Sequence, residues 1–255
     1  MANIARFLRI MLSKDEYMQA THSARVVSSH LVSKGILLID FQLIEPAQVN
    51  FKAGQYLAVF LPNSDKQSYY SIASSPNKKN SLELLVKEDK LGEGASYLFA
   101  LEEGDEVQFE MPMGEAFLRD EHSSNIVFVA GASGASYIRS MIHYLDEVDQ
   151  LKGREIHYFL GAREEDELLE VSYMHKLAAK YKGFHFIPAL SDQDNWDGQS
   201  GLITEVVERL MPDDLSGWDA YSAGSPGMVE AVAKTLINNK CLQPKNFYSD
   251  FYNPK

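Results

Sequence analysis

NIVFVAGASGASYIRSMIHYL, residues 125–145, is the stretch from which the fold of this chain can be worked out. Its apolar run Ile126–Val129 is rich in β-branched residues, which is typical of a strand buried on both faces of a parallel sheet. Small residues then turn the chain at 131–134, and apolar side chains recur at helical spacing from 138 to 145. A strand, a small-residue turn and a helix in this order present backbone N–H groups and a positive helix end to a phosphate. A tight turn that only packs a helix against a strand fits the same pattern, so both interpretations stay open here.

Downstream of this stretch, strand-like and helical patterns alternate. The acidic run 164–167 is expected to begin the first of these helices, because carboxylates favour a helix N-terminus. Together with 126–129 the pattern gives five strands in β–α alternation, which predicts a doubly wound parallel sheet. The expected strands are 156–160, 184–190, 220–222 and 247–251, and the expected helices are 167–181, 204–211 and 227–239.

Upstream, several short strands with regular turns predict a closed or nearly closed antiparallel β-barrel. We therefore expect an N-terminal helix or arm over 1–20, a β-barrel domain over 21–118 and an α/β domain over 119–255. A helix lying on a membrane surface is the alternative for the first segment, which shows no convincing signal-cleavage site. The expected barrel strands are 24–32, 36–41, 57–61, 68–73, 81–87 and 107–111, with a short helix at 94–101.

Charge and cysteine content narrow the function classes. Lys and Arg total 24 against 36 Asp and Glu, and the net charge of −12 argues against nucleic acid or an anionic membrane as the main partner. The single cysteine, Cys241, excludes an intramolecular disulfide and a cysteine-ligated iron–sulfur cluster within this chain. No apolar run is long enough for a membrane span, and we expect a cytoplasmic protein. No metal site is predicted, because no metal-ligand spacing is found among His143, His157, His175 and His185.

Several segments resemble motifs of the ferredoxin–NADP reductase superfamily. Residues 51–56 (FKAGQY) match its F-x-A-G-Q-Y strand, and residues 68–76 (SYYSIASSP) match its flavin motif R-x-Y-S with the usual I-A-S-S-P tail. Residues 92–98 (GEGASYL) are similar to the flavin-pyrophosphate segment, and residues 130–134 (AGASG) to the A-G-G-T-G of the nicotinamide-nucleotide domain. Within the superfamily the small NAD(P)H:flavin reductases are most similar. Two segments resemble those of the flavin reductases: 114–120 (GEAFLRD) and 134–140 (GASYIRS). Further positions that match the superfamily as a whole are 161–163, 196–201, 223–228 and 249–251.

The resemblance implies that the β-barrel domain binds FAD or another flavin and that the α/β domain binds NAD(P)H, and it implies which residues do so. Ser71 is expected to hydrogen-bond flavin N5, and Asp250 with Phe251 to close the nicotinamide side, so Ser71 and Asp250 are the expected catalytic residues. The alternatives are a strand serine bonded to backbone for Ser71, a barrel-packing tyrosine for Tyr70 and a solvated terminal carboxylate for Asp250. The implied cofactors are FAD, or exchangeable FMN or FAD, with NADH or NADPH. The expected cofactor-binding residues are Ser68, Tyr69, Tyr70, Ser71, Gly94, Ala95, Ser96, Gly131, Ala132, Ser133, Gly134, Arg163, Gly224, Met228 and Phe251.

The chain departs from the family pattern at three places. Ser68 replaces the motif arginine, and losing that charged contact to a flavin phosphate costs about 1.5–3 kcal/mol unless Lys66 or Lys87 compensates. Ala132-Ser133 replaces Gly-Thr, a mild change. The acidic residues 164–166 lie where NADP-preferring members gather positive charge, so NADH is expected to serve at least as well as NADPH. Ser68 and Ser71 are three residues apart, so a bulge or kink is expected if both reach one flavin.

Three functions follow from these motifs. The first is hydride transfer from NAD(P)H to a flavin, whose electrons then pass to an acceptor. The second is an FAD-bound reductase that delivers electrons to a separate iron–sulfur protein or oxygenase, although the acidic surface disfavours docking an acidic ferredoxin. The third is a non-catalytic nucleotide-binding subunit, which the missing arginine favours and the retained Ser71 and Asp250 disfavour.

Overall fold

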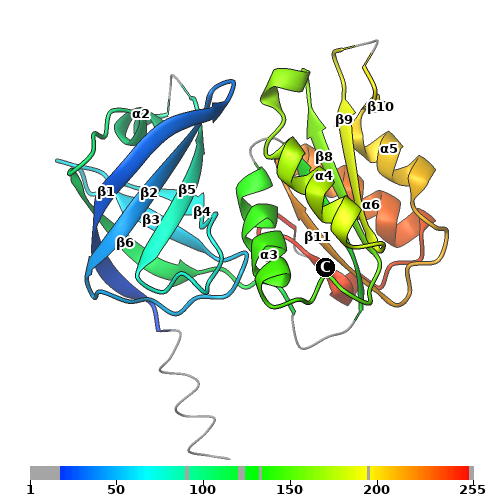
Figure 1. Cartoon of the computed structure of the whole chain (residues 1–255), viewed down its shortest axis with the longest axis horizontal. Coiled ribbons are helices and arrows are strands. Elements are labelled where there is room, and N and C mark those ends of the chain that lie inside the picture. The colour runs from blue at the N-terminus through cyan, green and yellow to red at the C-terminus, as the bar shows by residue number, and fades with distance from the viewer. Residues whose placement is uncertain (1–17, 90–91, 120–123, 132–133, 194–195, 253–255) are drawn as a thin grey trace, which may run out of the picture.

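The computed structural model describes residues 18–252 except 90–91, 120–123, 132–133 and 194–195. Two six-stranded sheets lie side by side along the long axis of the molecule (Figure 1). The predicted arm at 1–20 lies almost wholly outside the described residues, as do Ala132 and Ser133, so these stay predictions. In the described ranges, no helix is both long and apolar enough to cross a membrane.

The first sheet is antiparallel and curls into a barrel. Its strand order is β4-β3-β6-β1-β2-β5, and a bridge between Ile72 and Leu84 joins the two edge strands. Side chains that alternate inward fill the interior, where Phe41 and Phe109 meet edge to face at 5.0 Å. The strands are β1 (Ala20–Ser33), β2 (Ile36–Glu45), β3 (Tyr56–Phe60), β4 (Gln67–Ser71), β5 (Ser81–Lys87) and β6 (Glu106–Met113), with the short helix α2 at Glu93–Phe99.

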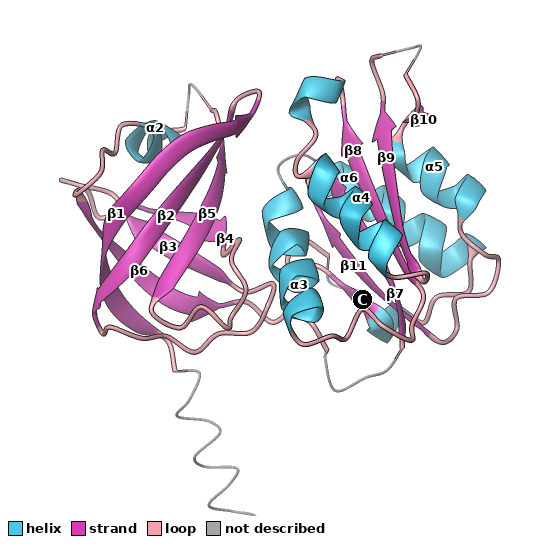
Figure 2. Cartoon of the chain, in the orientation of Figure 1, coloured by secondary structure: helices cyan, strands magenta, loops and turns pink. Residues whose placement is uncertain are grey.

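The second sheet is parallel, with helices on both faces (Figure 2). Its order is β10-β9-β8-β7-β11-β12, and the central β7 is buried from Ile126 to Ala130, as its apolar sequence predicts. Helices α3 and α4 cover one face, and α5 and α6 cover the other. The strands are β7 (Asn125–Gly131), β8 (Ile156–Ala162), β9 (Phe184–Leu190), β10 (Gln199–Ser200), β11 (Trp218–Ala223) and β12 (Phe247–Tyr248). The helices are α3 (Ala135–Glu147), α4 (Val171–Lys180), α5 (Ile203–Leu210) and α6 (Pro226–Lys234).

The predicted fold class, a β-barrel followed by a doubly wound α/β domain, is confirmed, and three details of the prediction are wrong. The acidic run does not begin α4: residues 165–167 form a separate 3₁₀ turn, and Glu170 has a left-handed φ of 50°, which interrupts a helix before Val171. β12 has two residues instead of five, and the equally short β10 was not predicted. The helix expected at 227–239 is found: α6 ends at Lys234, and one π-helical turn continues it to Asn239.

Candidate functional site

Strand β4 presents the expected flavin-motif residues on two faces. Its pairing with β3 is regular, with Ser71 opposite Tyr56 and Ser68 opposite Val59. No register shift separates the two serines, so the bulge or kink expected if both reach one flavin is not found in β4. Ser68 shares one face of the strand with Tyr70, and Ser71 shares the other face with Tyr69.

The Ser68 face of β4 packs against the start of α2. A Cβ added to Gly94 would lie 2.2 Å from the Ser68 Oγ and 2.8 Å from the Tyr70 hydroxyl oxygen, so only glycine lets helix and strand approach this closely. Burial raises the pKa of Tyr70, and the Asp89 carboxylate adds to this rise. Three expected flavin residues, Ser68, Tyr70 and Gly94, thus meet at one point.

Lys66 is one of the two lysines that could compensate for the missing arginine. Its Nζ lies 2.8 Å from the Glu93 Oε1 at the first turn of α2. Its charge is therefore already engaged by a carboxylate beside Gly94. Ser68 in the motif position adds no positive charge beside this ion pair.

The Ser71 face of β4 is bordered by aromatic rings and by Asp250. Tyr56 and Tyr69 meet edge to face at 6.0 Å, and a Cβ on Gly114 would lie 2.9 Å from the Tyr56 ring and 3.4 Å from an Asp250 carboxylate oxygen. Tyr69 is 61% exposed although it is aromatic. The two expected catalytic residues, Ser71 and Asp250, thus flank Tyr56, a residue that sequence reasoning did not single out.

Asp250 follows β12 near the end of the chain. Its carboxylate is accessible to solvent but crowded by protein atoms, which raises its pKa, and Glu115 adds to the rise while a hydrogen bond from the Ala116 backbone opposes it. Phe251 beside it is 66% exposed. The C-terminal segment therefore brings a carboxylate and an open aromatic ring to the barrel.

The small-residue turn after β7 packs against β11. A Cβ on Gly134 would lie 2.0 Å from the Ala223 carbonyl oxygen, so this glycine is explained by the close packing of α3 against β11. A Cβ added to Gly131 would instead lie 3.2 Å from the Met228 sulfur and 3.9 Å from the Gly224 Cα. Gly131, Gly224 and Met228 thus lie together at the carboxyl ends of β7 and β11. Doubly wound folds bind nucleotides at this end of the sheet, so the phosphate interpretation applies to these three residues.

Helix α3 joins this turn to the flavin-motif strand, and Figure 1 shows it between the two sheets. Four of its side chains donate hydrogen bonds to main-chain carbonyl oxygens of the barrel. Sequence reasoning missed all four as site residues, and their only signal was the match of 134–140 to the flavin-reductase segment. The pairs are Ser136 to Ser71 (3.0 Å), Arg139 to Ala73 (2.8 Å), Ser140 to Ser74 (2.7 Å) and Tyr137 to Ala116.

Arg139 also anchors a buried ion-pair network between the sheets. Its guanidinium bonds Glu83 of β5 and, through Nε at 2.9 Å, Glu170 before α4, which also bonds His143 at 3.0 Å. Burial alone would raise the pKa of Glu83, but Arg139 and Lys78 outweigh it and hold that pKa below its ordinary value. The pKa of Glu170 is likewise held low against burial by His143 and Arg139.

A second contact between the two parts of the chain involves the loop after β8. Lys34, in the turn after β1, places its Nζ 2.6 Å from the Glu164 carboxylate and 3.3 Å from that of Asp166. Arg163 is exposed, and its backbone N–H donates to Glu167 at 3.1 Å. The acidic run expected to disfavour NADPH is therefore partly neutralised from the barrel side.

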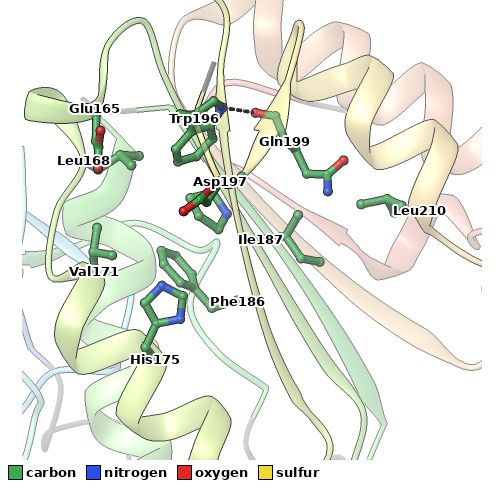
Figure 3. A pocket seen from close by; sticks show the side chains of 12 residues that line it. Glu165, Leu168, Val171, His175, Phe186, Ile187, Trp196, Asp197, Gln199 and Leu210 are labelled. Carbon is green, nitrogen blue, oxygen red and sulfur yellow. Dashed lines mark hydrogen bonds between the residues drawn. The ribbon is translucent and has the colours of Figure 1, made fainter. Parts of the chain in front are cut away.

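A hollow of about 730 Å³ lies between α4, residues 186–188 of β9 and the loop at Trp196, and Glu165 of the acidic run borders it (Figure 3). Phe186, His175 and Trp196 line it, and the Trp196 indole donates to the Gln199 carbonyl at 3.1 Å. None of the expected cofactor residues borders it. The expected cofactor residues instead lie at β4 and α2, beside Tyr56 and Asp250, and at the turn before α3.

Comparison with known proteins agrees with this arrangement. Residues 23–117 match the family model for the oxidoreductase FAD-binding domain, and residues 128–234 match that for the oxidoreductase NAD-binding domain. An NAD(P)H-flavin reductase of Vibrio harveyi is 30% identical over 218 residues, which are 82% of this chain and 90% of the relative. The chain belongs to the ferredoxin–NADP reductase superfamily.

Other relatives in the superfamily are longer than this chain. A phenol hydroxylase P5 protein of Acinetobacter pittii is 32% identical over 87% of this chain, and the match spans only 63% of that relative. The crystal structure of an Amycolatopsis cytochrome P450 reductase superposes with a TM-score of 0.81 at 24% identity, covering 91% of this chain and 69% of that one. The structural match supports the two-domain fold.

Proposed function

We propose that this chain is an NAD(P)H-dependent flavin oxidoreductase. A flavin bound at β4 and α2 would accept a hydride from NAD(P)H and pass its electrons to an acceptor. The observation that carries the proposal is the set of hydrogen bonds from α3 to the carbonyls of Ser71, Ala73 and Ser74. One helix begins at the nucleotide turn and holds the flavin-motif strand, so it fixes the two binding sites relative to each other.

The residues around Ser71 fit a flat aromatic ring. Tyr69 and Phe251 expose large aromatic surfaces that a ring system would cover, and the Ser71 hydroxyl can donate to a ring nitrogen. Because Ser71 is held through its carbonyl by Ser136, its hydroxyl is not needed for that contact. Asp250 places a carboxyl group with a raised pKa near the same surface. We assign Ser71 to orienting the flavin and Asp250 to the nicotinamide side.

We further propose that the flavin is held weakly enough to exchange. Ser68 offers a hydroxyl in place of a guanidinium, and Lys66 is engaged by Glu93. Losing one charge-assisted hydrogen bond weakens binding by about tenfold to a hundredfold. FAD and FMN would then both serve, because the phosphate end contributes little discrimination.

A second candidate function differs from the first in its electron acceptor. A relative from Pseudomonas sp. is named as the reductase component of phenol 2-monooxygenase, which supports a second candidate: a reductase that delivers electrons to a separate iron–sulfur protein or oxygenase. The 255 residues hold one cysteine, so a cysteine-ligated cluster would have to lie outside them. The non-catalytic alternative is disfavoured by the exposed aromatic surface beside Ser71 and Asp250. The cytoplasmic location stays a prediction.

An absorbance spectrum of the purified chain distinguishes the candidates. Loss of flavin on gel filtration, with NADH oxidation restored by added FMN or FAD, supports a flavin reductase. Stoichiometric FAD that stays bound, with slow turnover of free flavin, supports the oxygenase component. NADH that fails to reduce either flavin at saturation contradicts both.

A further inference from the structure

Two histidines and a glutamate gather on one face of the second sheet, at the amino ends of β8 and β9. His157 of β8 is in register with His185 of β9, and their rings lie 4.6 Å apart. Glu155 lies two residues before His157, so both side chains leave the strand on the same side. The ligand atoms of the three residues all lie within 4.8 Å of one another.

His157 is the inner member of this cluster. Its ring packs edge to face on Trp218 at 5.5 Å, and its Nδ1 is buried without a hydrogen-bond partner among the described residues. A buried ring nitrogen without a partner is uncommon in a folded protein. A neutral imidazole keeps a lone pair on one ring nitrogen, and this is the form in which histidine binds a metal.

The two outer members, Glu155 and His185, are partly exposed to solvent. The His185 side chain is 44% exposed and the Glu155 side chain 53%, and the two are joined by a hydrogen bond of 2.9 Å. Ligands of one Zn²⁺ lie about 2.0–2.2 Å from the metal, hence within about 4 Å of each other. Side-chain rotation of Glu155 and His185 can supply the remaining approach.

We propose that Glu155, His157 and His185 form a binding site for a transition-metal dication such as Zn²⁺. Two imidazoles and one carboxylate are a ligand set that zinc accepts, with a solvent molecule completing a tetrahedron. The site lies at the amino ends of the strands, at the edge of the sheet opposite the candidate nucleotide turn. Zinc there takes no part in hydride transfer.

Zinc bound at this site is expected to change the stability of the α/β domain. β10 pairs with only Ala189 and Leu190 of β9, so the half of β9 that holds His185 receives no hydrogen bonds from it. β8 already pairs with that half, and a metal bridging His157 and His185 would add a side-chain link between the two strands; Glu155 also bonds Asn125 of β7 through its backbone N–H at 3.0 Å. Zinc should therefore stabilise the folded α/β domain, because it binds the folded and not the unfolded chain.

Equilibrium dialysis of the tag-free full chain against Zn²⁺, with metal counted per chain, tests the site directly. Wild type should retain a single Zn²⁺ and show a higher Tm with zinc than with EDTA. His185→Ala and Glu155→Gln should each weaken retention by at least about tenfold, the lower range for disturbing a metal site, and abolish the rise in Tm. Neither variant needs flavin or NADH for its readout.

His175→Ala is the matched control. His175 belongs to the same domain but lies on α4 beside Phe186 (Figure 3), outside the cluster, so this variant should bind zinc like wild type. The site is refuted if wild type retains no zinc. It is equally refuted if His185→Ala and Glu155→Gln retain as much as wild type, or if His175→Ala loses as much as they do.

Discussion

Ser68 stands where the family motif has an arginine, and its hydroxyl lies against Gly94. Ser68→Arg would bring charged N–H donors to this point, so flavin affinity should rise about tenfold to a hundredfold. Ser68→Gln, which is long but uncharged, is the control. Fluorescence titration with FAD and FMN measures both. Equal affinities for the two variants would show that charge is not what flavin binding lacks here.

Ser71 is proposed to contact the reacting edge of the flavin. Ser71→Ala should slow flavin reduction by NADH about tenfold, the worth of one hydrogen bond, and change the flavin Kd less. Ser68→Ala, on the opposite face of the same strand, should leave the rate at saturating flavin unchanged. Stopped-flow reduction separates the two. An unaltered rate in Ser71→Ala would remove this serine from the chemistry.

Asp250 combines a raised pKa with a proposed role on the nicotinamide side. The folded protein holds this proton more tightly than the unfolded chain, so the stabilisation is complete below the ordinary Asp pKa. It is lost as the pH rises through the raised folded-state pKa. Asp250→Asn should therefore keep or raise the Tm at neutral pH while slowing hydride transfer. A clearly lower Tm would mean that the charged carboxylate stabilises the fold.

At the scale of elements, the contact of α3 with the barrel depends on Arg139. Arg139→Met leaves the buried Glu83 and Glu170 without their shared guanidinium, and should lower the free energy of unfolding by about 3–5 kcal/mol. Arg25→Met removes an exposed pair with Glu106 at 2.8 Å and should cost at most about 1 kcal/mol. Urea denaturation compares them, and equal losses would contradict a special role for the α3 network.

This network also predicts a pH dependence. Because the folded-state pKa values of Glu83 and Glu170 are lowered, their stabilisation is present above the ordinary Glu pKa and is lost as the pH falls through the lowered values. The difference in stability between wild type and Arg139→Met should shrink on acidification across that interval. A difference that grows toward acid pH would contradict the assignment.

The sequence predicts those helices and strands that a local pattern of apolar residues determines, and misses those that depend on contacts with distant residues or on backbone conformation. The run Ile126–Val129 and the spacing in α3 report burial directly, so β7 and α3 were placed well. The start of α4 depends on the left-handed φ of Glu170, and β10 on pairing with Ala189, and neither is encoded in a periodic pattern. For the candidate site, the motifs predicted Ser71 and Asp250, and the structure brings both beside Tyr56. The placement of Tyr56 between them depends on strand pairing across the barrel.

At the scale of the whole molecule, a lysine of the barrel bears on the choice of nicotinamide donor. Lys34 neutralises part of the acidic loop through Glu164 and Asp166. NADH should be used at least as well as NADPH, and Lys34→Met should lower kcat/KM for NADPH more than for NADH, because a 2′-phosphate would meet more negative charge. Steady-state kinetics with both donors decides this. A tenfold preference of wild type for NADPH would place the 2′-phosphate elsewhere.

The central claim is that α3 holds a flavin site and a nicotinamide site in position for hydride transfer. The most direct measurement is anaerobic stopped-flow absorbance of the full chain, saturated with FAD and mixed with NADH. We predict that NADH bleaches the flavin absorbance in wild type, and does so more slowly in Ser71→Ala at the same flavin occupancy. No bleaching in wild type at saturating FAD and NADH would contradict it.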